Sequence, residues 1–317
     1  FPFWGAFGTL PQNSIAAKVQ LSEALGLKGV NVTQETELLV KAIEGLKQEP
    51  NLFKDYIFPI ASAFFTSILG ALIAYFALNR QESLLLEKNN LIAANKWILD
   101  AIRARDSLIA IKTNYHKQLK ANPFQRVAAI PTVIKKSEPI LENYQDLAFL
   151  VPSEDDVGQS SHKWAQIPRI NAMVCNYNSL LHMWEKRNEI NEEFKQSIVR
   201  YCGGNANALI SPEEAISAFG EAGMVALIDV TERCIKLTDH IIIELGEFLE
   251  DFPGYVKTII NLKRIKKFGK IIQYTDNGNE ALISLAEPEV EVDFSNVQEL
   301  FGETVQNLKK RHSTGYE

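Results

Sequence analysis

The sequence predicts a mainly α-helical protein: a transmembrane helix, a long helical stalk that continues it, a helical cytosolic domain and a small C-terminal β-hairpin. Three observations predict this fold class: an uncharged apolar stretch over residues 56–79, helical spacing of apolar residues over most of the chain, and a tight-turn sequence between β-rich runs near the C-terminus. The 317 residues are 46% hydrophobic and 23% charged, which is typical of folded chains and excludes wholesale disorder. The net charge of −6 gives no overall attraction to nucleic acid or anionic lipid.

The first element, residues 1–54, is expected to form a juxtamembrane or cap segment. Residues 1–11 are aromatic and interrupted by Pro and Gly, so they cannot span a membrane alone. They are a membrane-interface loop, a buried plug or the exit of an upstream hydrophobic segment, in which case the membrane is crossed twice. Helical patterns follow over residues 14–25 and 36–47.

The second element is a transmembrane helix over residues 55–79. Its uncharged part, residues 56–79, is roughly 36 Å long as a helix, against about 30 Å for the hydrocarbon core. Pro59 falls in the first turn, where a missing N–H costs little. Aromatic residues that suit the headgroup layers lie near both ends: Tyr56, Phe58, Tyr75 and Phe76. The alternative is a buried helix of a soluble core, although a core helix of this length usually keeps a polar stripe.

One face of this helix carries small residues at helical spacing. They are Ala63, Ser67, Gly70, Ala71 and Ala74. Such a stripe lets two membrane helices approach closely, so we expect a homo-oligomer that packs through this face. The alternative is that small residues are simply common in membrane helices.

The third element, residues 80–121, is a helical stalk. Residues 81–121 contain neither Pro nor Gly, and apolar residues recur at helical spacing. Lys88, Asn95 and Arg105 occupy heptad positions and interrupt the repeat of a coiled coil. The segment is therefore either a rigid rod continuous with the membrane helix or an amphipathic helix packed on its own domain.

The fourth element, residues 122–269, is a helical cytosolic domain that begins at a break at Asn122 and Pro123. Its clearest start signal is Ser211 followed by Pro212 and Glu214, a capping box. Trp164 and Trp184 are expected as core anchors. We expect helices over residues 139–150, 164–201, 211–251 and 255–268, the last two separated at Pro253 and Gly254.

The fifth element, residues 270–317, is a β-hairpin followed by a helix. Residues 270–275 and 280–285 are β-rich and flank the turn sequence of residues 276–279. Residues 290–294 could add a third strand, and residues 296–311 a final helix.

The cysteines favour an orientation. Cys175, Cys202 and Cys234 are odd in number and match no disulfide framework, so reduced thiols are the simpler interpretation. Positive charges near the two membrane ends almost balance. We therefore expect the C-terminal part in the cytoplasm and the apolar helix in the inner membrane.

The sequence carries no signature of catalysis. It has no phosphate-binding glycine loop, no HExxH or paired CxxC zinc pattern and no GxSxG elbow. We expect no catalytic residue, no metal, no cofactor and no small-molecule substrate. His240 and Glu244 could share a helix face and ligate a metal, but a surface pair is the commoner arrangement; Cys175 and His182 lie two turns apart, which favours core packing over an activated thiolate.

A basic segment near the end of the cytosolic domain is the strongest charge feature. It contains Lys257, Lys263, Arg264, Lys266, Lys267 and Lys270, with no acidic residue between Asp251 and Asp276. An amphipathic basic helix can bind nucleic acid, an acidic protein or anionic lipid. The alternative is a solvated face covered by the acidic residues Glu287, Glu289, Glu291 and Asp293.

These features favour a non-enzymatic membrane protein. The apolar helix over residues 56–78, the run over residues 81–121 and the basic segment together give an arrangement that resembles membrane effectors of bacterial anti-phage defence systems, including retron-associated ones. The resemblance is architectural and assigns no functional residue. It implies a toxic, antiviral effector that damages the membrane and is kept silent by a protein–nucleic acid complex. A passive anchor or scaffold, and an enzyme with an unfamiliar site, are the alternatives.

Overall fold

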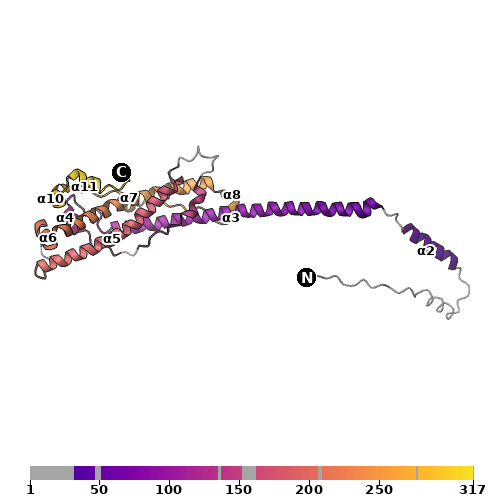
Figure 1. Cartoon of the computed structure of the whole chain (residues 1–317), viewed down its shortest axis with the longest axis horizontal. Coiled ribbons are helices and arrows are strands. Elements are labelled where there is room, and N and C mark those ends of the chain that lie inside the picture. Colours follow the sequence, from indigo (N-terminus) through magenta and orange to yellow (C-terminus); the bar gives the residue numbers. More distant parts are fainter. Residues whose placement is uncertain are drawn as a thin grey trace, which may run out of the picture. The chain divides into compact units, whose positions relative to one another are not determined.

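The computed structural model describes residues 32–46, 51–134, 137–151, 162–205, 209–275 and 278–316. These residues form helices joined by turns and contain no β-strand (Figure 1). The mainly helical fold class is therefore confirmed. The contacts divide the chain into two units, residues 1–77 and residues 78–317.

The first unit contains helix α2 (Val32–Leu46), the π-helix η1 (Phe53–Ile57) and the beginning of α3 (Phe58–Lys112). Helix α2 confirms the helix that the sequence predicts over residues 36–47. Pro59 lies in the first turn of α3, as expected. The helix expected over residues 14–25 and the aromatic stretch of residues 1–11 lie outside the described residues.

In the second unit, α3 is a core helix instead of a free stalk. Its buried apolar residues are Leu91, Ala94, Trp97, Ile98, Ala101, Ala104, Leu108, Ile109 and Ile111, and they share one core with residues of α5 and α7. The helix ends at Lys112, and turns follow. Of the two alternatives for residues 80–121, the amphipathic helix packed on its own domain is the one observed over residues 91–111, and a free stalk is not supported.

Helices α5 (Ile167–Tyr201) and α7 (Glu221–Ile259) pack along each other and form the centre of this domain (Figure 1). The indole Nε1 of Trp184 donates a hydrogen bond of 3.1 Å to Thr238 Oγ1 across the pair. Trp164, in the 3₁₀ turn η4 (Lys163–Ala165), meets the ring of Phe248 edge-on at 4.9 Å. Both tryptophans are buried, which confirms them as core anchors.

The capping box is confirmed, but the helix that it starts is short. Ser211 Oγ accepts from the Glu214 backbone N–H and Glu214 Oε2 accepts from that of Ser211, at 3.2 and 2.7 Å. Helix α6 (Pro212–Phe219) then ends at Gly220, whose φ of +87° favours glycine.

The helix break expected at Pro253 is wrong, since α7 continues through it to Ile259. Proline removes one backbone hydrogen bond from a helix interior. Pro253 itself is buried, and so are Phe252 and Val256 on either side. Burial of this apolar turn outweighs the local cost.

Asn122 begins a helix where the sequence suggested only a break. Its Oδ1 accepts from the backbone N–H groups of Phe124 and Gln125 and caps α4 (Pro123–Ala129). Arg187 of α5, fully buried, donates to three backbone carbonyls at the end of α4, those of Val127, Ile130 and Pro131, at 2.8–3.1 Å. Burial lowers the pKa of Arg187 to about 10. One cation thus satisfies the free carbonyls of a helix end.

The helix expected over residues 139–150 is wrong in its first half. Ile140 is held as extended chain by Asn178, whose amide accepts from its N–H at 2.9 Å and donates to its C=O at 3.0 Å. Only the 3₁₀ helix η2 (Tyr144–Leu150) follows. A side-chain amide here replaces the helical backbone partners.

The β-hairpin is also wrong. Asn95 accepts from the backbone N–H of Ile272 and donates to the C=O of Lys270, both at 2.9 Å, so this run is bound to a side chain of α3 instead of a strand. The second run forms helix α9 (Glu280–Ala286), which Asn279 caps. Residues 276–277 of the expected turn lie outside the described residues. The third strand expected over residues 290–294 is likewise absent from the described part of the tail.

The final helix expected over residues 296–311 is split into three short elements. These are the 3₁₀ helix η5 (Phe294–Val297), α10 (Gln298–Phe301) and α11 (Val305–Arg311). Gly302, with φ +61°, ends α10, and Thr304 caps α11. These elements form a second, smaller core with α6 and the start of α7, whose buried members include Ala215, Leu227, Phe294 and Leu308.

Candidate functional site

The apolar part of α3 is the first candidate site, since it is exposed all round. The most apolar 18-residue window has a mean hydropathy of 2.0, and none of it is buried. Ile60 and Phe65 expose 70% and 69% of their surface. This is one helix long and apolar enough to cross a membrane, and its exposure is typical of a surface that faces lipid.

Two hydroxyl groups in this stretch are bonded back to the backbone of the helix. Ser62 Oγ donates to the carbonyl of Pro59 at 3.4 Å, and Thr66 Oγ1 donates to that of Ser62 at 2.6 Å. Hydroxyl groups bonded back to their own helix leave no unsatisfied donor in an apolar environment. Ser62 and Thr66 are therefore compatible with the hydrocarbon core.

The small-residue face lies on this exposed stretch. Its members are Ala63, Ser67, Gly70, Ala71 and Ala74, and all five are exposed. A methyl group added to Gly70 would meet no atom within 4 Å. The described residues thus leave this face open for contact with another helix.

The basic segment of residues 257–270 is the second candidate site. It is not the single amphipathic helix expected over residues 255–268. It comprises the end of α7, the short helix α8 (Leu262–Ile265) and turns through Phe268 to Gly269, whose φ is +141°. All six cations are exposed: Lys257, Lys263, Arg264, Lys266, Lys267 and Lys270.

The acidic tail does not cover this segment. The carbonyl of Glu287 accepts from Lys112, Glu289 Oε1 pairs with His116 Nδ1 at 2.8 Å, and Asp293 caps Ser295. Glu291 lines a pocket on α7 together with Glu289. The alternative in which the acidic residues cover the basic segment is therefore wrong, because these residues contact other parts of the domain.

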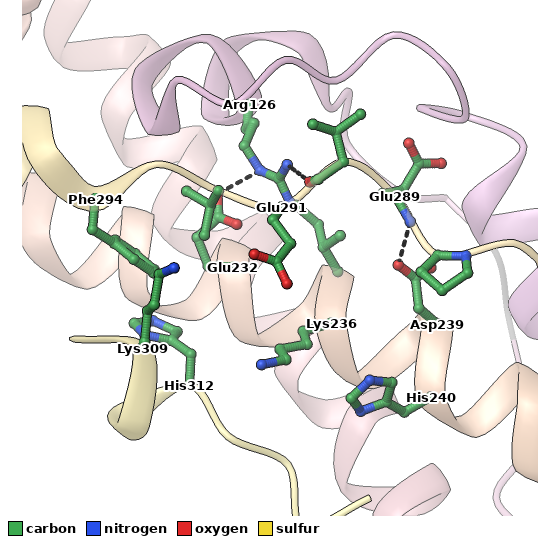
Figure 2. A pocket seen from close by; sticks show the side chains of 14 residues that line it. Arg126, Glu232, Lys236, Asp239, His240, Glu289, Glu291, Phe294, Lys309 and His312 are labelled. Atoms are coloured by element: carbon green, nitrogen blue, oxygen red, sulfur yellow. Dashed lines mark hydrogen bonds and ion pairs between the residues drawn. The ribbon is translucent and has the colours of Figure 1, made fainter. Parts of the chain in front are cut away.

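That pocket, beside the start and middle of α7, is the third candidate site (Figure 2). Its volume is about 320 Å³. Its floor comes from α7, and residues 288–294 pass over it. The charged and imidazole side chains in the lining are Arg126, Glu232, Lys236, Asp239, His240, Glu289, Glu291, Lys309 and His312.

Two buried ion pairs flank the pocket. Arg126 Nε donates to Glu232 Oε1 at 2.8 Å, and Lys112 Nζ lies 2.6 Å from Asp239 Oδ1. Arg126 also donates to the carbonyl of Val290 at 2.6 Å, and Asp239 Oδ2 accepts from the Glu289 N–H at 2.8 Å (Figure 2). The pairs therefore fix residues 287–290 to the domain by their backbone.

Burial raises the pKa of Glu232 and of Asp239 in spite of their cationic partners. A buried carboxylate is costly without its partner, so each pair depends on both members. Burial also raises the pKa of the Cys234 thiol, which disfavours the nucleophilic thiolate. The lining contains neither a cysteine nor a hydroxyl side chain. The two ion pairs hold the backbone of the tail against α7.

The two residue pairs that the sequence offered as weak candidates, His240 with Glu244 and Cys175 with His182, have other contacts in the structure. Glu244 is buried and accepts two hydrogen bonds from Arg169, at 2.8 and 3.0 Å, so it is not a surface residue. His240 contacts Thr314 Oγ1. His182 is exposed and pairs with Glu185, while Cys175 is half-buried, so core packing is wrong for this histidine. Among the described residues no group of three or more His, Cys, Asp or Glu could hold a metal ion.

The two buried ion pairs were not predicted from the sequence. Lys112 pairs with a residue more than a hundred positions away, as does Arg126. A signal was present for α3: Arg105 and Lys112 lie seven positions apart on its apolar face, and both are buried. Charges on an apolar stripe indicate buried partners.

Comparison of the chain with protein families, with curated proteins and with solved structures found no significant match.

Proposed function

We propose that this protein is a non-enzymatic membrane effector. The apolar part of α3 crosses the inner membrane, and the helical domain lies in the cytoplasm. A partner complex holds or triggers the domain, and the membrane helices self-associate and perturb the bilayer. The observation that carries the proposal is the complete exposure of this apolar stretch.

The connection between the two parts supports a role in which the domain controls the membrane helix. Helix α3 runs from Phe58 to Lys112 as one element. The chain therefore passes from the apolar stretch into the folded core without a linker. A change that a partner imposes on the core has a direct covalent path to the membrane helix.

Self-association is supported by the small-residue face. Close packing of helices in lipid depends on van der Waals contact, because lipid removes the hydrophobic driving force. Gly70 lies at the middle of this face and has open space around its Cα. A bulky side chain there would keep two helices apart.

The resemblance to anti-phage effectors favours a protein–nucleic acid complex as the inhibitor of the domain.

Expression in bacteria, followed with a membrane-potential dye, tests the proposal. We expect induction of the full chain to collapse the potential and stop growth. Gly70→Leu should retain the potential, whereas Ala61→Leu, on the opposite side of the helix, should still collapse it. Normal growth with the unchanged chain in the membrane would refute the effector and favour the alternatives, a passive anchor or scaffold or an enzyme with an unfamiliar site. Collapse with Gly70→Leu would show that close helix contact is not the mechanism.

A further inference from the structure

We infer that residues 257–270, together with Lys88 of α3, form a juxtamembrane basic patch that binds the anionic phospholipid headgroups of the leaflet from which α3 emerges. The inference rests on the proposed membrane crossing and assigns the class of molecule that the basic segment binds.

The described residues leave the patch with an excess of positive charge. None of its six segment cations forms an ion pair with a described residue. Of the acidic groups near the segment, Asp251 pairs with Lys163 at 3.3 Å. Glu87 accepts from the Asn261 N–H at 3.0 Å and so places one negative charge within the patch, against the six cations of the segment and Lys88. A local excess of positive charge on a chain of net charge −6 favours an external polyanion.

The patch is held in a fixed place on α3. Ile265, at the end of α8, is fully buried in the core, and Asn95 binds the carbonyl of Lys270 at 2.9 Å. The Asn261 backbone is bound to Glu87. Because both ends are fastened to α3, the exposed lysines are presented by a rigid surface, which lowers the entropic cost of binding.

Its distance from the apolar stretch suits a headgroup. Glu87 and Lys88 follow Asn79 by eight and nine residues on the same helix, a rise of roughly 12–14 Å. The headgroup layer begins at the end of the apolar stretch, and charges act over a Debye length of about 8–10 Å. Extended lysine side chains therefore reach the anionic surface.

Phe268 strengthens the assignment to a membrane surface. It is 41% exposed, and its ring lies 5.3 Å from Lys88 Nζ and 4.9 Å from Lys267 Nζ. An exposed aromatic ring between cations is typical of residues that lie at the membrane interface.

Lipid is favoured over nucleic acid by position. The chain itself keeps the patch next to the bilayer, so headgroups are present at a high effective concentration without any encounter. A nucleic acid would have to compete with that surface and would be repelled by it.

Hydrogen exchange on the full chain in nanodiscs tests the inference. Discs of phosphatidylcholine alone are compared with discs that contain about one third phosphatidylglycerol. We expect the amides of residues 257–270 to exchange about tenfold more slowly in the anionic discs, and high salt to remove this difference. The variant with Lys263, Arg264, Lys266 and Lys267 changed to Glu should lose it.

A charge-matched variant, with Lys195, Arg200, Lys309 and Lys310 changed to Glu, should keep the slowing. Equal exchange in both discs would overturn the inference while leaving the membrane crossing intact. Failure of the chain to enter either disc would instead refute the crossing. Slowing by a single-stranded RNA in neutral discs, with none from phosphatidylglycerol, would assign the patch to nucleic acid.

Discussion

The first part of α3 and the whole of α7 are both long and apolar, but the apolar residues of α7 are mostly buried and those of the first part of α3 are exposed. In α7, Leu227 and Leu245 are fully buried, and charged residues such as Glu221, Glu250 and Lys257 are exposed. In α3, Ile60 and Phe65 are about 70% exposed, and residues 56–79 have no charged face. The difference teaches that the distribution of charge, and not the apolar content, separates a buried core helix from an apolar helix that is exposed.

The largest expected effect comes from charging the exposed apolar helix. Ile68→Arg with Leu69→Arg places two cations near the middle of the stretch, at a cost of about 5–7 kcal/mol for insertion in a membrane. We expect the double variant to leave the membrane fraction of lysed cells, measured by flotation of vesicles. Ile134→Arg with Leu141→Arg, which charges two exposed apolar residues of the domain, should float as the unchanged chain does. Equal flotation of both variants would show that the exposed apolar helix contributes no more to membrane association than exposed apolar residues of the domain do.

The core of the domain should instead be sensitive to the loss of a charge. Lys112→Met leaves Asp239 buried without its partner, which typically costs about 3–5 kcal/mol of folding stability. The double variant Lys112→Met with Asp239→Asn should recover part of that loss. Urea unfolding of the full chain in detergent, followed by tryptophan fluorescence, measures both. A double variant less stable than the single one would show that the pair is not coupled.

A smaller contrast is expected for apolar truncation. Leu245→Ala in α7 removes a fully buried side chain and should lower the free energy of unfolding by about 2–4 kcal/mol. Leu72→Ala in α3, which truncates an exposed side chain, should change it by less than about 0.5 kcal/mol. Thermal unfolding of both variants in one detergent provides the comparison. Similar losses would mean that residue 72 packs in a core.

The smallest effect concerns the contact between Asp229 of α7 and the C-terminal tail. Burial acts to raise the pKa of Asp229, but the hydrogen bond from His312 and the charges of Arg233, His312 and Arg311 hold the pKa below its ordinary value of 3.8. As the pH falls toward 3.8, Asp229 takes up a proton in the unfolded chain before it does so in the folded chain. The ionised Asp229 carboxylate therefore stabilises the folded chain at neutral pH, and this stabilisation is lost as the pH falls through the lower pKa of the folded state.

Asp229→Asn should therefore cost about 1 kcal/mol at pH 7 and progressively less as the pH falls below 3.8, for example at pH 2.5. Denaturant unfolding of both chains at the two values measures this. Asp293→Asn, on an exposed cap of the same tail, provides a control. A cost for Asp229→Asn that is the same at both values would show that its charge is unimportant.

The sequence predicted the elements whose signal is local. The capping box at Ser211, the uncharged stretch and the long apolar periodicity of α5 each depend on residues close in the chain. The exposed helix and the mainly helical class could therefore be predicted.

What could not be predicted depends on contacts between distant residues. Asn95 holds residues 270–272 away from a hairpin, and burial carries α7 through Pro253. The place of the acidic residues of the tail, by Lys112 and His116, depends on pairs more than 150 positions apart. The spacing of residues along the chain does not specify which distant residues will be in contact.

The crossing of the membrane by α3 is tested most directly by labelling single cysteines from one side. Glu44→Cys and Glu185→Cys, both at exposed positions, are placed in a chain with Cys175→Ser and Cys202→Ser, and spheroplasts are treated with a membrane-impermeant maleimide. We predict that residue 44 reacts in intact spheroplasts and that residue 185 reacts only after lysis. Equal reaction of both residues before lysis would contradict the account.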